Sequence, residues 1–477
     1  MTDNTIFLGK GEIPEVLFLP MANRHGLVTG ATGTGKTVSL QIMAEEFSRR
    51  GVPVFAADIK GDLSGISQPG KSIDFLDERA KQVGLSPYTH EATPTMFWDV
   101  FGEQGHPMRT TITDMGPLML ARLMGLSDAQ EGALNIAFKI ADQEGLALLD
   151  LKDLRALLKD LTERGKQITT EYGNVATTTV GAILRQLIVI EEQGGDKFFG
   201  EPALDIKDFM RTTRDGRGYV NIIAADKLIT SPQLYATFLL WLMSELFQEL
   251  PEVGDTEKPS LVFFFDEAHL LFADAPASLL QKIEQTVKLI RSKGVGIYFV
   301  TQNPLDIPAS VLAQLGNRVQ HALRAYTPRE QQAVKAAATT FRPNPKFSTE
   351  KAITELGKGE ALVSVLDLKG VPTVVDRTLV RPPSSQLGPV TALQRKTVMA
   401  ASPVFGKYET PIDRDSAYEK LKARAVVAAP APSGKSSQTT SMIEKEAGKF
   451  ARQVGYSVAR QLGNALVRGI LGGLTRR

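Results

Sequence analysis

Residues 30–37 carry the pattern in this chain that is best suited to chemistry: Gly-Ala-Thr-Gly-Thr-Gly-Lys-Thr. The spacing G-x-x-x-x-G-K-[ST] is that of a phosphate-binding loop, in which backbone N–H groups cradle phosphate oxygens. Lys36 supplies a positive charge for the β- and γ-phosphates, and the Thr37 hydroxyl is placed to hold Mg²⁺. We therefore predict that nine residues bind the phosphates of ATP: Gly30, Ala31, Thr32, Gly33, Thr34, Gly35, Lys36, Thr37 and Val38.

Two carboxylates follow an apolar run far downstream. Residues 260–265, Ser-Leu-Val-Phe-Phe-Phe, indicate a buried parallel strand that ends at Asp266 and Glu267. Open α/β sheets bind their ligands at the carboxyl ends of such strands. We expect Asp266 to hold the Mg²⁺ hydration shell with Thr37, and Glu267 to act as general base for the attacking water. The alternative is an Asp-Glu cap at the start of the next helix.

Two further polar side chains follow predicted strands. Gln302 comes after the apolar run 294–301, and it can reach the γ-phosphate and the attacking water if that strand neighbours the strand 260–265. We favour this sensor role over that of a turn-initiating residue before the Asn-Pro pair that follows. Asp58 ends the run 52–57, where it either tunes the Mg²⁺ site or caps its own loop.

Three arginines are candidates for a guanidinium that stabilises the γ-phosphate transition state: Arg291, Arg318 and Arg324. Such an arginine finger is often supplied by a neighbouring subunit. For each of the three, an ion-paired or structural arginine is the alternative.

The elements around these residues predict an α/β fold. Residues 25–29 indicate a short buried strand before the phosphate loop, and Val38 to Arg50 indicate a helix with Leu40, Met43 and Phe47 on one face. That helix directs its N-terminus at the phosphates. We expect a mostly parallel central sheet with core strands within four regions: residues 24–60, 218–226, 260–302 and 360–380.

Composition bounds the function classes. The net charge of +2 gives no global signal for nucleic acid, so a DNA-binding surface would have to be local. The chain has no cysteine, which excludes disulfides and thiolate metal sites and fits a cytoplasmic location. No secretory signal peptide is recognisable at the N-terminus. We also expect no membrane-spanning segment, because the longest apolar stretch, 234–243, is too short to cross a bilayer.

The phosphate loop, the Asp266-Glu267 strand and the Thr-Gln pair together resemble the FtsK/HerA branch of RecA-like ATPases. More closely, the chain resembles the bacterial HerA-helicase-like group that includes the YjgR proteins. The similarity covers most of the chain and rests on these segments: Met21 to the phosphate loop, 57–65, 97–102, 105–107, 263–272, 290–296, 301–308, 381–383 and 387–389.

The resemblance implies a RecA-like core, hexameric rings with ATP sites between subunits, and transport of DNA or protein. It also implies that an arginine near the sensor strand reaches the neighbouring site, which favours Arg291 over Arg318 and Arg324. HerA proteins carry a β-barrel domain ahead of the ATPase core, whereas 29 residues precede Gly30 here. Those residues have the pattern of a small hairpin, so we do not expect a HerA-style role in DNA end resection.

Six parts follow from these anchors. In chain order they are a short N-terminal β segment (1–23), the first part of the ATPase core (24–102), a mostly helical insertion (103–217), the second part of the core (218–381), an extended segment with a Pro/Ala/Ser-rich linker (382–440) and a basic helical tail (441–477). Within the insertion, leucines at helical spacing predict a helix over 146–161, and residues 174–190 predict another. The tail suits docking on protein, contact with nucleic acid, or a membrane surface.

These observations predict an ATPase of the HerA/FtsK type that uses ATP and Mg²⁺. The resemblance implies that it acts on DNA as a homo-oligomer, a hexamer. Two alternatives stay open: an ATPase that acts on protein clients, and a slow nucleotide-gated scaffold. A nucleotide kinase is disfavoured, because Asp266, Glu267 and Gln302 suit attack by water. The sequence contains no base-reading motif that would decide between ATP and GTP.

Overall fold

One twelve-stranded sheet runs through the part of the chain that the computed structural model describes, residues 4–173, 175–272 and 277–428. Eight strands are parallel to one another, in the spatial order β10-β3-β9-β8-β4-β7-β5-β6. Beyond β10 the sheet continues with β11, β12, β1 and β2, each antiparallel to the strand before it. The strands are β1 Thr5–Lys10, β2 Pro14–Phe18, β3 Gly26–Thr29, β4 Val54–Asp58, β5 Thr95–Asp99, β6 His106–Pro107, β7 Val220–Ala224, β8 Leu261–Phe265, β9 Val295–Thr301, β10 Asn317–Gln320, β11 Glu360–Ser364 and β12 Asp376–Val380.

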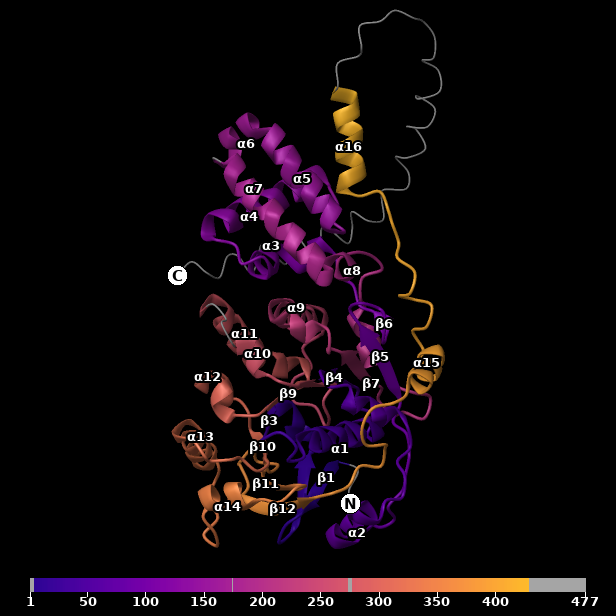
Figure 1. The fold of residues 1–477 in the computed structure, drawn as a ribbon, viewed down its shortest axis with the longest axis vertical. Helices are drawn as coiled ribbons and strands as arrows, with labels where there is room; N and C mark the ends of the chain where they lie inside the picture. The colour runs from indigo at the N-terminus through magenta and orange to yellow at the C-terminus, as the bar shows by residue number, and fades with distance from the viewer. Residues whose placement is uncertain (1–3, 174, 273–276, 429–477) are drawn as a thin grey trace, which may run out of the picture. The chain divides into compact units, whose positions relative to one another are not determined.

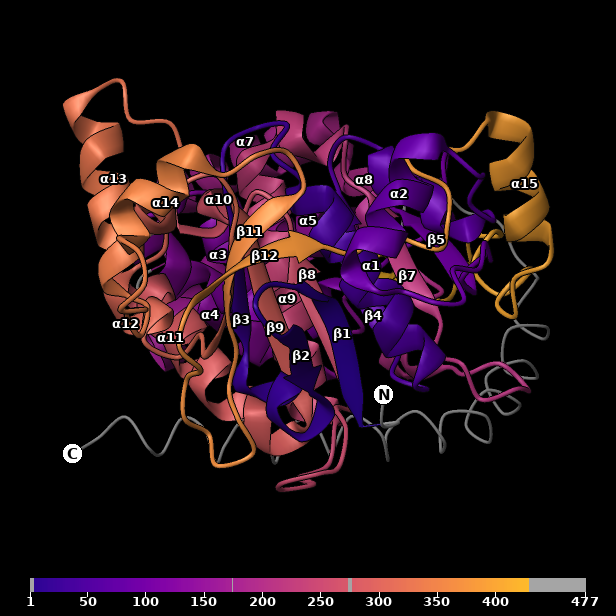
Figure 2. The same ribbon diagram turned by 90° about the horizontal axis from the view of Figure 1, so that it is seen from below.

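Helices cover both faces of this sheet (Figure 1). The α-helices of the described residues are α1 Lys36–Arg49, α2 Asp74–Val83, α3 Ile112–Leu123, α4 Asp128–Glu144, α5 Leu151–Glu163, α6 Gly165–Tyr172, α7 Thr177–Ile190, α8 Asp196–Phe198, α9 Pro232–Glu249, α10 His269–Phe272, α11 Ala277–Ile290, α12 Ala309–Leu312, α13 Pro328–Thr339, α14 Thr349–Glu355, α15 Ala392–Ala400 and α16 Ala417–Ala428. Figure 2 shows α13 and α14 at one end of the sheet, near β11, and α15 at the other end, near β5.

The alternation of side chains along β8 divides the core into two. Phe263 and Phe265 face a large cluster that includes α9, α11 and the helices α3–α8, whereas Val262 and Phe264 face a second cluster with α1. Phe47 of α1 lies against Phe264, with ring centroids 6.4 Å apart. Because both faces of the central strands are buried, β8 is apolar at every position, as the sequence predicts.

The predicted α/β fold with a mostly parallel sheet is confirmed, and several elements differ in detail. The helix predicted over 146–161 begins at Leu151, because the Asp150 side chain accepts hydrogen bonds from the backbone N–H groups of Lys152 and Asp153. The N-terminal residues form a hairpin of β1 and β2, and β1 also pairs with β12, so the hairpin extends the central sheet.

Residues 4–422 belong to one unit, and residues 423–477 form a second, of which the structure describes only 423–428. The basic tail predicted over 441–477 and the end of the predicted linker, residues 429–440, lie outside the described residues. Among the helices that are described, none has the length and apolar character to cross a membrane.

Candidate nucleotide site

The loop between β3 and α1 has the backbone that its glycines permit. Gly30, Gly33 and Gly35 have φ angles of 152°, 80° and 121°, a region that side chains with a Cβ rarely adopt. A Cβ on Gly30 would lie 2.5 Å from the Cβ of His321, so the position has no room for a larger residue. The loop leads directly into α1, whose first residue is Lys36, and backbone N–H groups at a helix N-terminus favour anions.

The Lys36 side chain lies along its own loop. Its Nζ donates hydrogen bonds to the carbonyl oxygens of Gly30, at 2.6 Å, and Ala31, at 3.2 Å. Burial lowers the pKa of Lys36, and the negative charge of Glu267 opposes that change. The ammonium group thus lies against the carbonyls of its own loop, with Glu267 and Asp266 near enough to affect its pKa.

The order of the strands brings Gln302 between the loop and Glu267. Strand β9 lies between β3 and β8, so the residue that follows β9 is flanked by the residues that follow the other two. The Thr32 hydroxyl donates to Gln302 Oε1 at 3.2 Å, and Gln302 Nε2 donates to both Glu267 oxygens at 3.2 and 3.3 Å. One amide thus connects the phosphate loop to the predicted general base.

Glu267 is held in an uncommon conformation. Its φ angle is 47°, in the left-handed region, and non-glycine residues in that region concentrate at functional sites. Its side chain is 7% exposed, and its carboxylate lies 3.5 Å from Lys60 Nζ and 3.4 Å from His269 Nδ1. In this conformation the carboxylate accepts hydrogen bonds from Gln302, which also contacts Thr32 of the phosphate loop.

Asp266 has the chemistry of a Mg²⁺ ligand. Burial, and then the neighbouring Glu267, raise the pKa of Asp266 to about 6. Its Oδ1 accepts the backbone N–H of Glu267 at 3.0 Å. Within the described residues, no protein group forms a hydrogen bond with the Thr37 hydroxyl, so this oxygen is available as a second ligand. Oxygen ligands in small number, with phosphates and water completing the shell, suit Mg²⁺.

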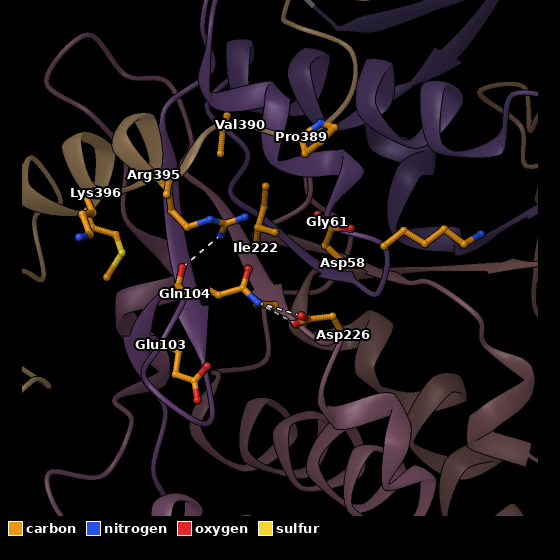
Figure 3. Close-up of a pocket in the computed structure, with 14 residues that line it drawn as sticks. Asp58, Gly61, Glu103, Gln104, Ile222, Asp226, Pro389, Val390, Arg395 and Lys396 are labelled. Carbon is orange, nitrogen blue, oxygen red and sulfur yellow. Dashed lines mark hydrogen bonds between the residues drawn. The ribbon is translucent and has the colours of Figure 1, made fainter.

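Asp58 lies on the far side of β8, at the end of β4. Burial, with Asp62 and Asp266 nearby, raises the pKa of Asp58 to about 7. Its carboxylate also accepts a hydrogen bond from the Gly61 backbone, as the loop-capping interpretation expects, and its effect on the Mg²⁺ site stays a prediction. It borders a cavity of about 350 Å³ (Figure 3). Across that cavity, Arg395 of α15 donates to the Gln104 carbonyl at 3.1 Å.

The three candidate arginines lie in different places. Arg291 begins a short 3₁₀ turn before β9, at the end of that strand opposite Gln302, and pairs with Asp255 at 3.0 Å. Arg318 of β10 donates hydrogen bonds to the backbone carbonyls of Leu312 and Leu315, so its guanidinium ties α12 and the turn after it to the sheet. Arg324 is exposed and follows β10 at the edge of the sheet that carries the phosphate loop.

Sequence reasoning missed a histidine beneath the phosphate loop. His321 is fully buried; its Nδ1 donates to the Glu360 carbonyl at 2.8 Å, and its Nε2 accepts the Ser39 hydroxyl at 2.8 Å. Burial lowers the pKa of His321 to about 4, so the ring is neutral at pH 7. The only available signal was its position after the run 317–320, and three of the four residues in that run are polar, which is not typical of a core strand.

The sequence matches the family described as helicase HerA-like C-terminal over residues 4–452. The match spans nearly the whole chain, and the chain belongs to this family of P-loop ATPases of the HerA/FtsK type. No curated protein gives a match in a sequence search.

Solved structures share this fold. The bacterial conjugative coupling protein TrwBdeltaN70, in complex with sulphate, aligns with a TM-score of 0.52 at 14% identity, over 81% of this chain and 92% of that one. VirB4 of Thermoanaerobacter pseudethanolicus gives 0.50 and 14%, over 83% and 99%. Plasmid coupling protein TrwB with the non-hydrolysable GTP analogue GDPNP gives 0.50 and 15%, over 79% and 89%. These likenesses establish the RecA-like fold.

Proposed function

We propose that this protein hydrolyses ATP with Mg²⁺ and works as a hexameric ring motor on DNA. The observation that carries the ATPase part is the continuous contact from Thr32 through Gln302 to Glu267, because it links the phosphate loop to a carboxylate able to accept a proton from water. Family membership supports the motor class. DNA as the polymer and the sixfold ring are inferences from the family.

Each residue of the site has a role in this proposal. Lys36 and the loop backbone bind and orient the phosphates, while Glu267 takes the proton of the attacking water and Gln302 reports whether a γ-phosphate is present. Thr37 and Asp266 would hold Mg²⁺, whose charge offsets that of the phosphates. Asp58 would act on the Mg²⁺ site indirectly, through its charge near Asp266, because its carboxylate is already hydrogen-bonded to its own loop.

The test is steady-state ATP hydrolysis by the purified protein, with and without single- and double-stranded DNA. We expect DNA to stimulate hydrolysis, and Glu267→Gln to lower kcat by about 10²- to 10⁴-fold because the general base is lost. If the hydrolysis rate is the same with and without DNA, the result would favour a protein client over DNA as the substrate of the motor. Nucleotide binding without turnover in any condition would favour a nucleotide-gated scaffold.

A further inference from the structure

Glu267 has a cationic neighbour that the roles above leave unused. Lys60 Nζ lies 3.5 Å from Glu267 Oε1, and the Lys60 side chain is about half-exposed whereas that of Glu267 is 7% exposed. Lys60 comes from the loop after β4, and β4 lies next to β8 in the sheet. It therefore approaches Glu267 from the opposite side to Gln302, which follows β9.

The loop that carries Lys60 is fixed at several points. Gly61 has a φ angle of 75°, which allows the turn directly after the lysine, and its N–H is bonded to the buried Asp58 carboxylate. The Ser64 hydroxyl donates to the Gly61 carbonyl at 2.7 Å and accepts the N–H of Val390 at 3.1 Å. These hydrogen bonds hold the backbone from which the Lys60 side chain extends.

Charge explains why a second cation is useful here. Asp58, Asp266 and Glu267 place three carboxylates at one edge of the sheet, and bound ATP would bring a further negative charge toward them. Lys36 Nζ is hydrogen-bonded to the loop carbonyls, and in our proposal its charge serves the phosphates. Among the lysines and arginines that the structure describes, Lys60 is the one within 4 Å of Glu267, and His269 Nδ1 lies 3.4 Å from the other carboxylate oxygen. Glu267 is the carboxylate that must approach the γ-phosphate most closely in our proposal.

We propose that Lys60 is a positioning residue that pairs with Glu267 and offsets the repulsion between this carboxylate and the γ-phosphate of ATP. The inference rests on the proposed ATPase site and adds a second lysine to it. The competing explanation is a structural ion pair that only ties the β4 loop to β8; a half-exposed pair of that kind contributes little to stability.

The test is a double-mutant cycle read by binding. Affinities for ATPγS and for ADP, both with Mg²⁺, are measured by calorimetry for the wild type, Lys60→Ala, Glu267→Gln and the double variant. We expect Lys60→Ala to weaken ATPγS by about tenfold and ADP by less than about twofold, since only ATPγS has the third phosphate. In the Glu267→Gln background, the loss on removing Lys60 should fall below about twofold, because no charge remains to offset.

Controls separate charge from structure. Lys60→Arg keeps the charge and should bind ATPγS as the wild type does. Lys71→Ala removes an exposed lysine further along the same connection between β4 and α2 and should change neither affinity. Equal weakening of ATPγS and ADP, no weakening at all, or an unchanged loss in the Glu267→Gln background would each overturn the proposal.

The binding cycle is independent of turnover. A wild type that binds ATPγS but does not hydrolyse ATP would defeat the proposed ATPase function, and the cycle would still decide the role of Lys60. If hydrolysis does occur, kcat should fall by about tenfold or more in Lys60→Ala, and the double variant should be no slower than Glu267→Gln alone. If the wild type hydrolyses ATP and Lys60→Ala has the same kcat and nucleotide affinities, the inference about Lys60 is wrong and the proposed ATPase function stands. Failure of the wild type to bind either nucleotide would defeat both.

Discussion

At the scale of residues, the site is a set of buried or half-buried charges that few protein partners satisfy. Asp58 and Asp266 both have a pKa raised by burial and by neighbouring carboxylates. Such an arrangement opposes folding when every group is ionised, and it becomes favourable once a cation binds. A site of this kind suits a ligand that brings positive charge, as Mg²⁺ with a nucleotide does.

Gln302 gives a prediction at this scale. Gln302→Ala should lower kcat for ATP by about 10²-fold, because the amide that contacts Glu267 and the phosphate loop is lost, while ADP affinity stays within about threefold. Gln314→Ala, which removes an exposed glutamine after α12, is the matched control and should leave both values unchanged. Kinetics and calorimetry on the two variants check this, and an equal loss of ADP affinity in Gln302→Ala would contradict it.

His321 gives a pH prediction. Its folded pKa of about 4 lies below the value of about 6.5 in an unfolded chain, so the unfolded state binds more protons between these values. The stability from the neutral ring is present above pH 6.5 and is lost as the pH falls toward 4. Between pH 7 and pH 5, the unfolding free energy of the wild type should fall by about 2 kcal/mol more than that of His321→Gln.

Urea unfolding at the two pH values measures this difference. The other titrating groups, including the buried carboxylates whose pKa values are raised, are shared by both proteins and cancel in the comparison. Equal losses in the two proteins would show that His321 is protonated without cost in the folded state.

At the scale of elements, α1 links the phosphate loop to the segment that follows β12. Glu46 of α1 pairs with Arg381 at 2.9 Å, and both side chains are about 4% exposed. The adjacent Glu45 accepts the backbone N–H groups of Ser384 and Ser385 at 2.8 and 2.9 Å. Two consecutive buried glutamates thus hold this later segment against the helix that begins with Lys36, so the segment is part of the support of the site.

Removing one member of that buried pair should be costly. Arg381→Met should lower the free energy of unfolding by about 2 kcal/mol, because Glu46 loses its most buried partner while it keeps Arg49 and Arg50. Lys346→Met breaks the pair with Glu12, in which both side chains are more than half exposed, and should cost less than about 1 kcal/mol. Urea denaturation of the two variants compares them, and similar losses would argue against a buried pair.

At the scale of the whole molecule, the described arginines bear on assembly. Arg291 lies at the end of β9 remote from Gln302 in its own chain, so it can act at a nucleotide only in a neighbouring subunit. Arg324 is exposed beside the phosphate loop, and Arg318 is bonded to backbone carbonyls. We expect Arg291 to be the finger that acts between subunits.

Mixing two inactive variants tests this expectation. Arg291→Ala subunits keep an intact phosphate loop, and Lys36→Ala subunits keep an intact finger, so a mixed ring contains some complete sites. Hydrolysis should recover to roughly a quarter of the wild-type rate in an equimolar mixture if subunits mix at random. The same mixture with Arg318→Ala or Arg324→Ala identifies the alternative fingers, and no recovery with Arg291→Ala would exclude that residue.

Much of the site was readable from the sequence, because its central parts are local. Eight consecutive residues define the phosphate loop, and the apolar run before Asp266 defines a buried strand, so no distant contact is needed to recognise either. The role of Gln302 required one further assumption, that its strand neighbours β8, and the structure confirms that adjacency.

Only the tertiary structure decided which of these residues contact one another. The insertion of β9 between β3 and β8 puts Gln302 in contact with both Thr32 and Glu267, and the pairing of β4 with β8 brings Lys60 to Glu267. His321 reaches the phosphate loop only because the polar strand β10 pairs with β3. The Thr32–Gln302 and Lys60–Glu267 contacts join residues more than 200 positions apart, and Gln302 and Glu267 are 35 positions apart. All of them depend on strand order, which hydrophobic periodicity along one segment does not encode.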